Sequence, residues 1–205
     1  LEAFETARAL WAGERVDGKR TFDADDAGLN YTPPQGAGIP VYVGGEGPHM
    51  CRMAGKRADG LLFNGSHPKD MAWAAEQVEA GLEERPADRG EFDFAAYASV
   101  SLSSDAEAAR EAARPAFAFI TAGAAPPVLD RHDIDPETAS EIGEHISAGE
   151  FEAAFAAVTE GMIDAFCIAG TPDGVADRID AVLEHADSFV AGSPLGPDLE
   201  EAITR

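Results

Sequence analysis

Cysteine is scarce in this 205-residue sequence, which holds only Cys51 and Cys167. Two cysteines that lie far apart cannot build a disulfide framework, and neither belongs to a CxxC redox or zinc motif. The five histidines show no metal-binding spacing, and the HExxH and GxSxG patterns are both absent. The sequence therefore predicts no metal site and gives no support to nucleophilic hydrolysis.

Positive charge is also scarce, because 15 Lys and Arg residues stand against 38 Asp and Glu residues. The net charge of -23 excludes nucleic acids and anionic membranes as partners, since both require a basic surface. Only three of the basic residues are lysines. Excess acid with few lysines favours a protein adapted to high salt, although an ordinary acidic surface would share this composition.

Long hydrophobic runs are missing too. The longest uncharged run covers residues 115–129 and contains Gly123, Pro126 and Pro127. It falls short of the ~20 apolar residues that a membrane-spanning helix requires. The first residues do not show the basic and then apolar pattern of a signal peptide. We therefore expect a soluble, cytosolic protein whose buried core comes from its 45% of hydrophobic residues.

The sequence does contain an alternation of strand and helix patterns, which is typical of an α/β fold with a parallel sheet. Between residues 105 and 165 the pattern is helical in pieces, interrupted at Pro115, at Pro126-Pro127 and in a polar loop at residues 130–136. The predicted strands cover residues 39–43, 61–64, 92–102 and 188–191, and the other predicted helices cover about residues 1–11, 48–57, 69–84, 151–162 and 172–183.

Several further expectations follow from the same patterns. The polar segment 17–38 is expected to be an irregular connection, and His132 is expected to be a solvated loop residue. Trp11, Trp73 and the phenylalanines fall at helix or strand spacing and are expected in the core. Four strands and an uncapped first helix fit the second half of a (β/α)8 barrel, which usually needs roughly 250 residues. A small doubly wound domain is the alternative.

A glycine-rich turn is the strongest local signal for a binding site. The predicted strand ends at Gly44-Gly45, and Pro48 suits the first position of a helix. Glycines let a ligand approach the backbone closely, and a helix start offers free N–H groups to an anion such as a phosphate. A tight turn that needs glycine for its geometry explains the pattern equally well. Glu46 would have to point away from a bound anion.

Two other strand ends also carry polar turns. Asn64-Gly65 follows the second predicted strand, and residues 192–198 follow the last one. Ligands of parallel α/β folds bind at the carboxyl ends of the strands, where both turns would lie. Plain connecting loops are the alternative interpretation.

Three stretches together resemble one family: residues 39–55, residues 58–64, and residues 168–172 continuing through 192–198. In this order and spacing they are similar to the C-terminal part of the luciferase-like flavin- or deazaflavin-dependent oxidoreductases. Residues 66–69 and the ending at 192–198 favour the branch of methylenetetrahydromethanopterin reductases, which use coenzyme F-420.

The resemblance implies a luciferase-like (β/α)8 TIM barrel in which residues 1–205 form the C-terminal part of a single domain, without strands one to four. The family's catalytic acid lies in the preceding half, so no residue here inherits that role, and residues 1–205 alone are expected to be inactive. His67 stands where the related sugar-phosphate dehydrogenases carry a lysine, which argues against that activity. The residues implied to hold the cofactor's phosphate are Gly44, Gly45, Glu46, Gly47 and Pro48, with Asn64 and Gly65 at the next strand end.

The implied reaction is hydride transfer from reduced coenzyme F-420 to the methylene group of a pterin-bound one-carbon unit. Two alternatives remain open: an FMN-dependent luciferase-like monooxygenase, and a non-catalytic barrel relative that binds a flavin or nothing. A small-molecule pterin substrate and a homo-oligomer are the expected partners.

Overall fold

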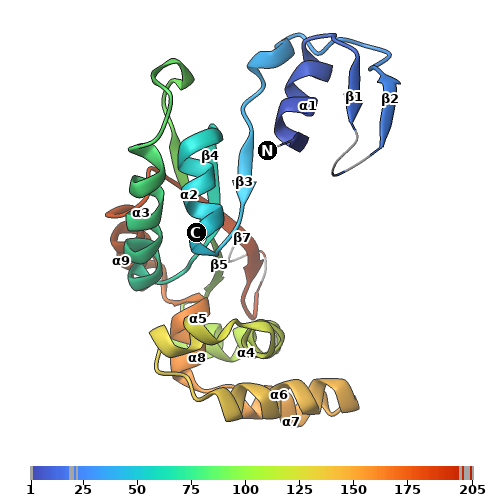
Figure 1. The fold of residues 1–205 in the computed structure, drawn as a ribbon. Coiled ribbons are helices and arrows are strands. Elements are labelled where there is room, and N and C mark those ends of the chain that lie inside the picture. Colours follow the sequence, from blue (N-terminus) through green and yellow to red (C-terminus); the bar gives the residue numbers. More distant parts are fainter. Residues whose placement is uncertain (1, 19–20, 22, 199, 201–203, 205) are drawn as a thin grey trace.

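A computed structural model of the protein describes residues 2–18, 21, 23–198, 200 and 204. A parallel sheet flanked by helices forms its main body, and a short N-terminal segment lies to one side (Figure 1). The strands are β1 (Val16–Gly18), β2 (Ala24–Ala27), β3 (Tyr42–Gly44), β4 (Gly60–Asn64), β5 (Asp93–Leu102), β6 (Ile168–Gly170) and β7 (Ser188–Leu195). The helices are α1 (Glu2–Trp11), α2 (Pro48–Arg57), α3 (Pro68–Leu82), α4 (Ala106–Gly123), α5 (Pro126–Arg131), α6 (Pro136–Ala148), α7 (Phe151–Ala157), α8 (Glu160–Phe166) and α9 (Pro172–Leu183).

The main sheet has five strands, and all of its pairings are parallel. β3 pairs with β4, and β4 pairs with the first half of β5. The long β5 then pairs with β6 near its end and with β7 along most of its length. Since a strand has two edges, β4 and β6 share one edge of β5 while β7 takes the other. The predicted α/β class with a parallel sheet is confirmed.

The strands differ from the predictions in three places. β3 begins at Tyr42 rather than residue 39, because Pro40 has no N–H to donate to a ladder. β6 was missed, since three residues are too few to show a periodicity. β7 continues to Leu195, so the first residues of the turn expected at 192–198 belong to the strand.

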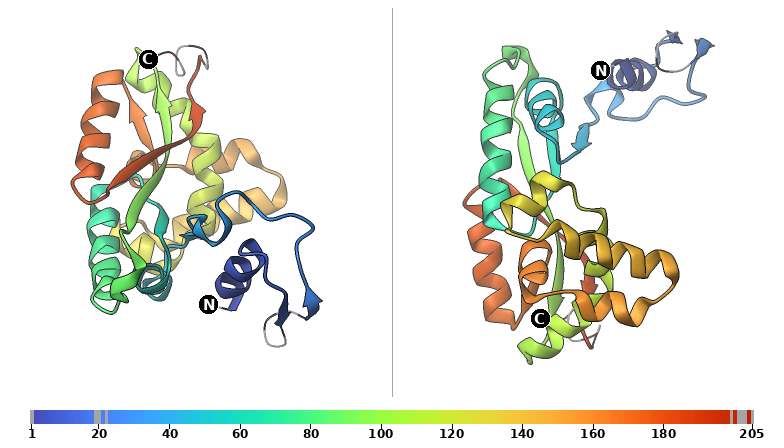
Figure 2. Two further views of the ribbon diagram at one scale, coloured as in Figure 1. Left: turned by 90° about the horizontal axis from the view of Figure 1, so that it is seen from above. Right: turned by 60° about the horizontal axis from the view of Figure 1, so that its bottom comes forward.

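The segment expected to be an irregular connection holds an antiparallel pair, β1 and β2. Their sequences, VDG and ADDA, are too polar to read as strands. With α1 they form the part that lies apart from the main sheet in Figure 2. Asp59 ties this part to the body, because it forms an ion pair with Arg8 and accepts a hydrogen bond from the Val41 N–H at 2.7 Å. Leu1, where this first helix was expected to begin, lies outside the described residues.

The helices confirm two predicted start signals and correct two other expectations, at Pro115 and at residues 151–162. α2 begins at Pro48, and Thr171 caps α9 by accepting from the Gly174 N–H, both as predicted. Pro115 does not interrupt α4, because it is exposed and its lost hydrogen bond leaves a carbonyl that water can reach. The interruption predicted at Pro126 and Pro127 is confirmed, because α4 ends at Gly123 and the two prolines begin a separate helix, α5. The helix expected at 151–162 is two helices, α7 and α8, since Thr159 caps the second.

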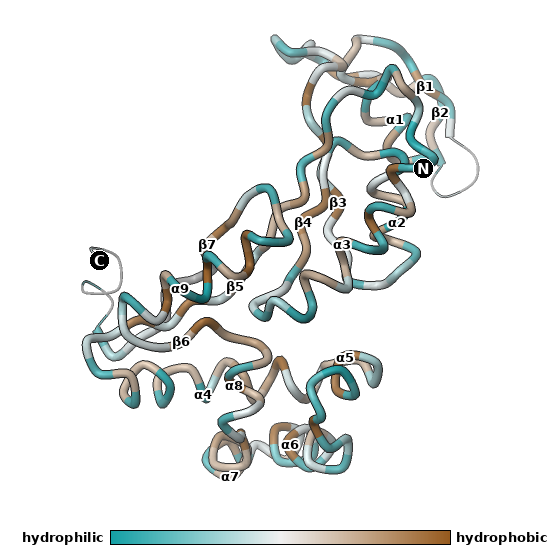
Figure 3. Tube along the Cα trace, turned by 90° about the vertical axis from the view of Figure 1, so that its left-hand side faces the viewer, coloured by the Kyte–Doolittle hydropathy of each residue, from teal (hydrophilic) through white to brown (hydrophobic). Residues whose placement is uncertain are grey.

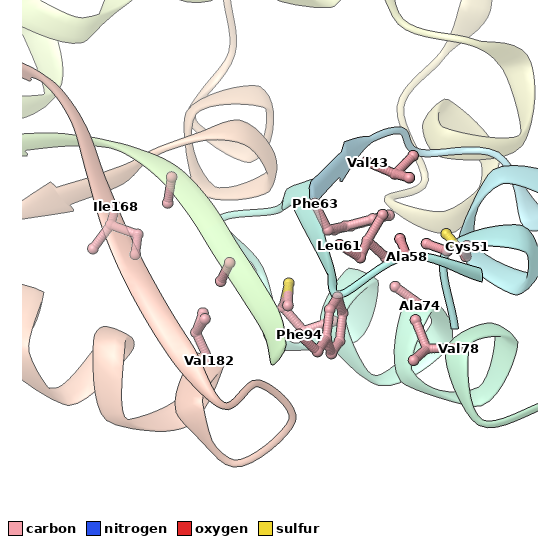
Figure 4. Close-up of a cluster of buried hydrophobic side chains, with 14 of the residues drawn as sticks. Val43, Cys51, Ala58, Leu61, Phe63, Ala74, Val78, Phe94, Ile168 and Val182 are labelled. Atoms are coloured by element: carbon pink, nitrogen blue, oxygen red, sulfur yellow. The ribbon is translucent and has the colours of Figure 1, made fainter. Parts of the chain in front are cut away.

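Two hydrophobic cores stabilise the body. The sheet core lies between the strands and α2, α3 and α9, and includes Leu61, Phe94 and Val182 (Figure 4). In Figure 3 hydrophobic stretches follow β3, β4 and β6. The helical core lies among α4 to α8, around Phe117 and Ile142.

The expectation that every phenylalanine lies in the core is wrong for two of those that the structure describes, while Phe22 lies outside the described residues. Phe119 on α4 is 51% exposed and Phe151 on α7 is 47% exposed. Their rings lie 6.2 Å apart on the surface of the helical part. Helical spacing placed them correctly on one face, and that face is not fully covered. None of the described helices is long and apolar enough to cross a membrane.

The acidity predicts salt-dependent stability. A net charge of -23 repels itself, and the screening length shortens from about 10 Å at 0.1 M salt to about 3 Å at 1 M. Screening also weakens surface ion pairs such as Arg110–Glu160, but these contribute little. We expect the melting temperature to rise by several degrees from low to molar potassium chloride, measured by circular dichroism. A flat or falling curve would show that the acidity is incidental.

Candidate functional site

The glycine-rich turn joins the carboxyl end of β3 to the start of α2. Gly47 is the N-cap of α2, and no side chain caps this helix. The N–H groups of Met50 and Cys51 bond back to the Gly47 carbonyl, each at 3.0 Å. Because Pro48 has no N–H, the N–H groups of Gly47 and His49 are the ones that this helix start can offer to an outside acceptor such as an anion.

The surroundings of the glycines in this turn differ, so glycine is favoured at each position for a different physical reason. A Cβ on Gly44 or Gly47 would meet no atom within 4 Å. A Cβ on Gly45 would lie 2.8 Å from the Cβ of Met50, so packing alone explains that glycine. The open space beside Gly44 and Gly47 is what close approach of a ligand requires.

A shallow hollow of about 450 Å³, which we name the turn groove, opens beside this turn. Gly44, Gly45 and Glu46 line it from the turn, and Leu62, Asn64 and Tyr97 line it from the neighbouring strands β4 and β5. Glu46 is exposed and belongs to the lining of the hollow, so its negative charge lies close to the place where an anion would bind.

A second hollow of about 360 Å³, which we name the helical cavity, lies between the end of β4 and the helical part. Glu46 and Asn64 line both hollows, so the two adjoin there. Gly65 lines the cavity and is buried, and a Cβ on it would come within 2.8 Å of the Met71 sulfur. Other walls are aliphatic or aromatic, from Phe63, Phe119, Ile120, Val128 and Phe166, or polar, from Ser66, Asp70 and Arg131.

The structure thus brings the predicted site residues together at the carboxyl ends of β3 and β4. Gly47 and Pro48 begin α2 at the edge of the turn groove, and the other five line one or both hollows. Their binding of a cofactor stays a prediction.

Sequence reasoning missed a buried charged cluster on one wall of the helical cavity. Asp70 on α3 is 6% exposed. Its carboxylate accepts from the Arg131 Nε at 2.5 Å and contacts the His132 Nε2 at 2.6 Å. The Arg131 guanidinium lies over the Trp73 ring, 4.4 Å from its centroid. Four side chains from two helix ends therefore hold one another in fixed positions.

His132 was expected to be solvated, and this is wrong, since its side chain is only 5% exposed. It is the C-cap residue of α5, and its contact with Asp70 links the end of this helix to the N-terminal turn of α3. Burial raises the pKa of Asp70, but the hydrogen bonds and charges of His132 and Arg131 outweigh it, so the pKa lies below its ordinary value. Asp70 is a carboxylate at neutral pH.

His67 caps α3 beside this cluster. Its Nδ1 accepts from the Lys69 N–H at 3.0 Å, and its ring lies edge-on to the His132 ring at 4.9 Å between centroids. Burial, followed by the positive charges of Arg178 and His132, lowers its pKa to about 4. The neutral ring is the form that can accept, so the cap exists only while His67 is unprotonated.

Because of this cap, we expect the stability of the folded protein to decrease as His67 becomes protonated in acid. The pKa of His67 falls from about 6.5 unfolded to about 4 folded, so its contribution is complete above pH 6.5 and is lost as the pH falls toward 4. We expect the parent to lose a few degrees of melting temperature across this range. His67→Asn keeps a cap acceptor that does not titrate. A variant curve parallel to the parent's would contradict the assignment.

Among the described residues, no group of three or more His, Cys, Asp or Glu side chains is arranged to hold a metal ion. Cys51 and Cys167 are both buried thiols. Burial raises the pKa of Cys51 to about 11 and that of Cys167 to about 12, so neither is a ready nucleophile.

Known proteins similar to the chain point to one family. Residues 1–187 match the family described as luciferase-like monooxygenase. The 5,10-methylenetetrahydromethanopterin reductase of Methanolobus tindarius is 42% identical over 206 residues, which are 98% of this chain and 62% of the relative. That of Archaeoglobus fulgidus is 40% identical over 209 residues, again 98% and 62%. The chain therefore spans less than two thirds of the length of these relatives.

Solved structures agree with this similarity. The coenzyme F-420-dependent tetrahydromethanopterin reductase from Methanopyrus kandleri superposes with a TM-score of 0.88 at 40% identity, covering 98% of this chain and 59% of that one. A secondary alcohol dehydrogenase bound to an F-420–acetone adduct superposes with a TM-score of 0.71 at 21% identity over 98% of this chain and 57% of that one. The second likeness shows the fold alone.

Proposed function

The chain belongs to the luciferase-like monooxygenase family, and from this premise we propose that it is part of an F-420-dependent methylenetetrahydromethanopterin reductase. Its fold is that of the luciferase-like TIM barrels, as expected from the sequence. The observation that carries the proposal is 40–42% identity to two such reductases, which extends over 98% of the chain.

The residues of the turn groove fit the phosphate of a deazaflavin cofactor. Gly44 and Gly47 leave open space, and the uncapped start of α2 offers N–H groups. Glu46 is the one unfavourable feature, because its negative charge lines the same groove. Leu62 and Tyr97 form the rest of the groove's wall.

The chemistry comes mainly from the cofactor. A bound reduced deazaflavin would supply a hydride to the methylene carbon and release one proton, which balances the proton taken up by the nitrogen when its bond to that carbon breaks. The described residues bind and orient the two reactants. Phe63 and Phe166 give the helical cavity apolar wall surface next to the place where the two hollows adjoin.

Three further parts of the proposal concern the whole protein. The chain forms the C-terminal part of one barrel domain, and its 59% coverage of the reductase structure supports that it is a part of such a domain. The protein works in the cytoplasm, where its two buried cysteines stay reduced. It assembles as a homo-oligomer.

Equilibrium titration tests the choice of cofactor. Oxidised coenzyme F-420 and FMN are added separately to the purified protein while absorbance and fluorescence are followed. We expect saturable binding of the deazaflavin and much weaker binding of FMN. A preference for FMN would favour a luciferase-like monooxygenase, and binding of neither would favour a non-catalytic relative.

Glu46→Gln gives a charge test of the phosphate site. Removing a negative charge beside a phosphate should leave the deazaflavin Kd unchanged or lower it by up to several-fold, most at low salt. Glu107→Gln, on the exposed first turn of α4, is a matched control with no expected effect. A variant Kd that rises at low salt would contradict a phosphate at this turn.

A further inference from the structure

We propose that Arg131 binds the pterin ring of the substrate in the helical cavity, and that Asp70 and Trp73 are positioning residues for its guanidinium. The inference rests on the proposed function and assigns one part of the site to the second reactant.

The Arg131 guanidinium is held in position by its neighbours, but only some of its hydrogen-bond donors have a partner. Its Nε donates to Asp70 at 2.5 Å, and its plane lies over Trp73 at 4.4 Å. Within the part of the chain that the structure describes, its two Nη groups make no hydrogen bond. Arg131 lines the cavity, and its side chain is 16% exposed. An otherwise buried arginine with free donors at a cavity wall is ready to bind an acceptor.

The position of the cavity favours the substrate over the cofactor. Hydride transfer needs the two reactants in direct contact. The turn groove, where the cofactor's phosphate is proposed, adjoins the helical cavity at Glu46 and Asn64. In Figure 1, α5, which carries Arg131, lies below α3. The cavity is therefore the neighbouring volume in which a second ligand can touch the first.

The walls favour a planar heterocycle. Phe63, Phe119 and Phe166 offer aromatic surface to a flat ring. A pterin presents a carbonyl oxygen and ring nitrogens as acceptors, and amino and ring N–H groups as donors. The fork of Arg131 matches the acceptors, and the carboxylate of Glu46 matches the donors.

The charges favour a neutral ring over a phosphate at this wall. Asp70 already neutralises Arg131, and Glu46 adds a further negative charge to the cavity. A doubly charged phosphate would meet little net positive charge here. A neutral ring needs only hydrogen bonds, which the guanidinium can still donate.

The test compares binding of the two reactants to Arg131 variants. 5,10-Methylenetetrahydromethanopterin is titrated calorimetrically without a hydride donor, and oxidised coenzyme F-420 is titrated separately. Arg131→Lys keeps the charge facing Asp70 but loses the fork, and Arg131→Gln loses both. Arg110→Lys is the control, since Arg110 pairs with Glu160 and Asp164 outside the cavity.

We expect the pterin Kd to rise about 10- to 100-fold in Arg131→Gln and less in Arg131→Lys. The deazaflavin Kd should stay within about twofold of the parent's. Asp70→Asn should raise the pterin Kd selectively as well, which a general loss of structure would not do. If Arg131→Gln does not fold, Arg131→Lys decides the result.

Three results would overturn the inference. They are an unchanged pterin Kd in a folded Arg131 variant, an equal rise of both Kd values, and a parent that binds the deazaflavin but no pterin. A parent that binds neither ligand would overturn the proposed function itself, and the pterin assignment with it. The deazaflavin titration of the parent therefore separates the two failures.

Discussion

Replacing Asp70 with alanine should lower the free energy of unfolding by about 3–5 kcal/mol, because it leaves a buried ion pair without one partner. Arg131 loses the acceptor of its Nε at 2.5 Å, and His132 loses a contact at 2.6 Å. The two side chains are 16% and 5% exposed, so water cannot fully replace the carboxylate. Denaturant unfolding of parent and variant measures the difference.

Asp130→Ala is the matched control for this loss. Asp130 is an exposed aspartate on the same short helix as Arg131, so its replacement should change the stability by no more than about 0.5 kcal/mol. If Asp70→Ala costs less than about 1 kcal/mol, the cluster does not hold α5 against α3.

The same cluster predicts how the Asp70→Ala difference depends on pH. The pKa of Asp70 is depressed in the folded state, so its contribution is present above the unfolded value of about 3.9 and is lost as the pH falls below it. The gap between parent and Asp70→Ala should therefore be wide at neutral pH and narrow in acid. A gap that stays constant down to pH 2 would contradict the direction of this shift.

Gly44→Val should weaken deazaflavin binding by at least about tenfold while leaving the fold intact. The new side chain meets no atom within 4 Å and enters the turn groove, where the cofactor is proposed to lie. Gly44 ends a strand and has no positive φ, so valine is compatible with its backbone. Cofactor titration and a melting curve of the same sample separate lost contacts from unfolding.

Variants of two other glycines serve as controls for Gly44→Val. Gly38→Val also meets no atom within 4 Å, and it lies outside both hollows, so it should bind the cofactor as the parent does. Gly45→Val should destabilise the protein because of the 2.8 Å approach to Met50, so lost binding there is not evidence for a ligand. A folded Gly44→Val variant with parental affinity would make the turn a connection only.

Local signals in the sequence predicted much of the fold. The proline at the start of α2 and the threonine cap of α9 are one-residue effects, and both are where the pattern placed them. The parallel strands β4 and β5 were visible because burial makes their residues apolar over several positions. β1, β2 and β6 were missed because they have three or four residues each, and the first two are polar.

The glycine-rich turn could be predicted from the sequence, and the buried charged cluster of the helical cavity could not. The turn at Gly44 to Pro48 and the strand end at Asn64 are local features, and they do lie together. Asp70 and His132 are 62 residues apart, and only tertiary packing joins them. A histidine in a polar stretch gives no sign that a distant carboxylate buries it, so the cluster could not be found before the structure.

Anaerobic hydride transfer tests the central claim most directly. The whole protein, of which this chain forms one part, is mixed with reduced coenzyme F-420 and 5,10-methylenetetrahydromethanopterin, and the return of the oxidised deazaflavin absorbance is followed. We predict reoxidation that requires the pterin, proceeds without dioxygen and forms one methyl product for each deazaflavin oxidised. Reoxidation that occurs only with dioxygen, or none in a protein shown to bind both ligands, would contradict the proposed function.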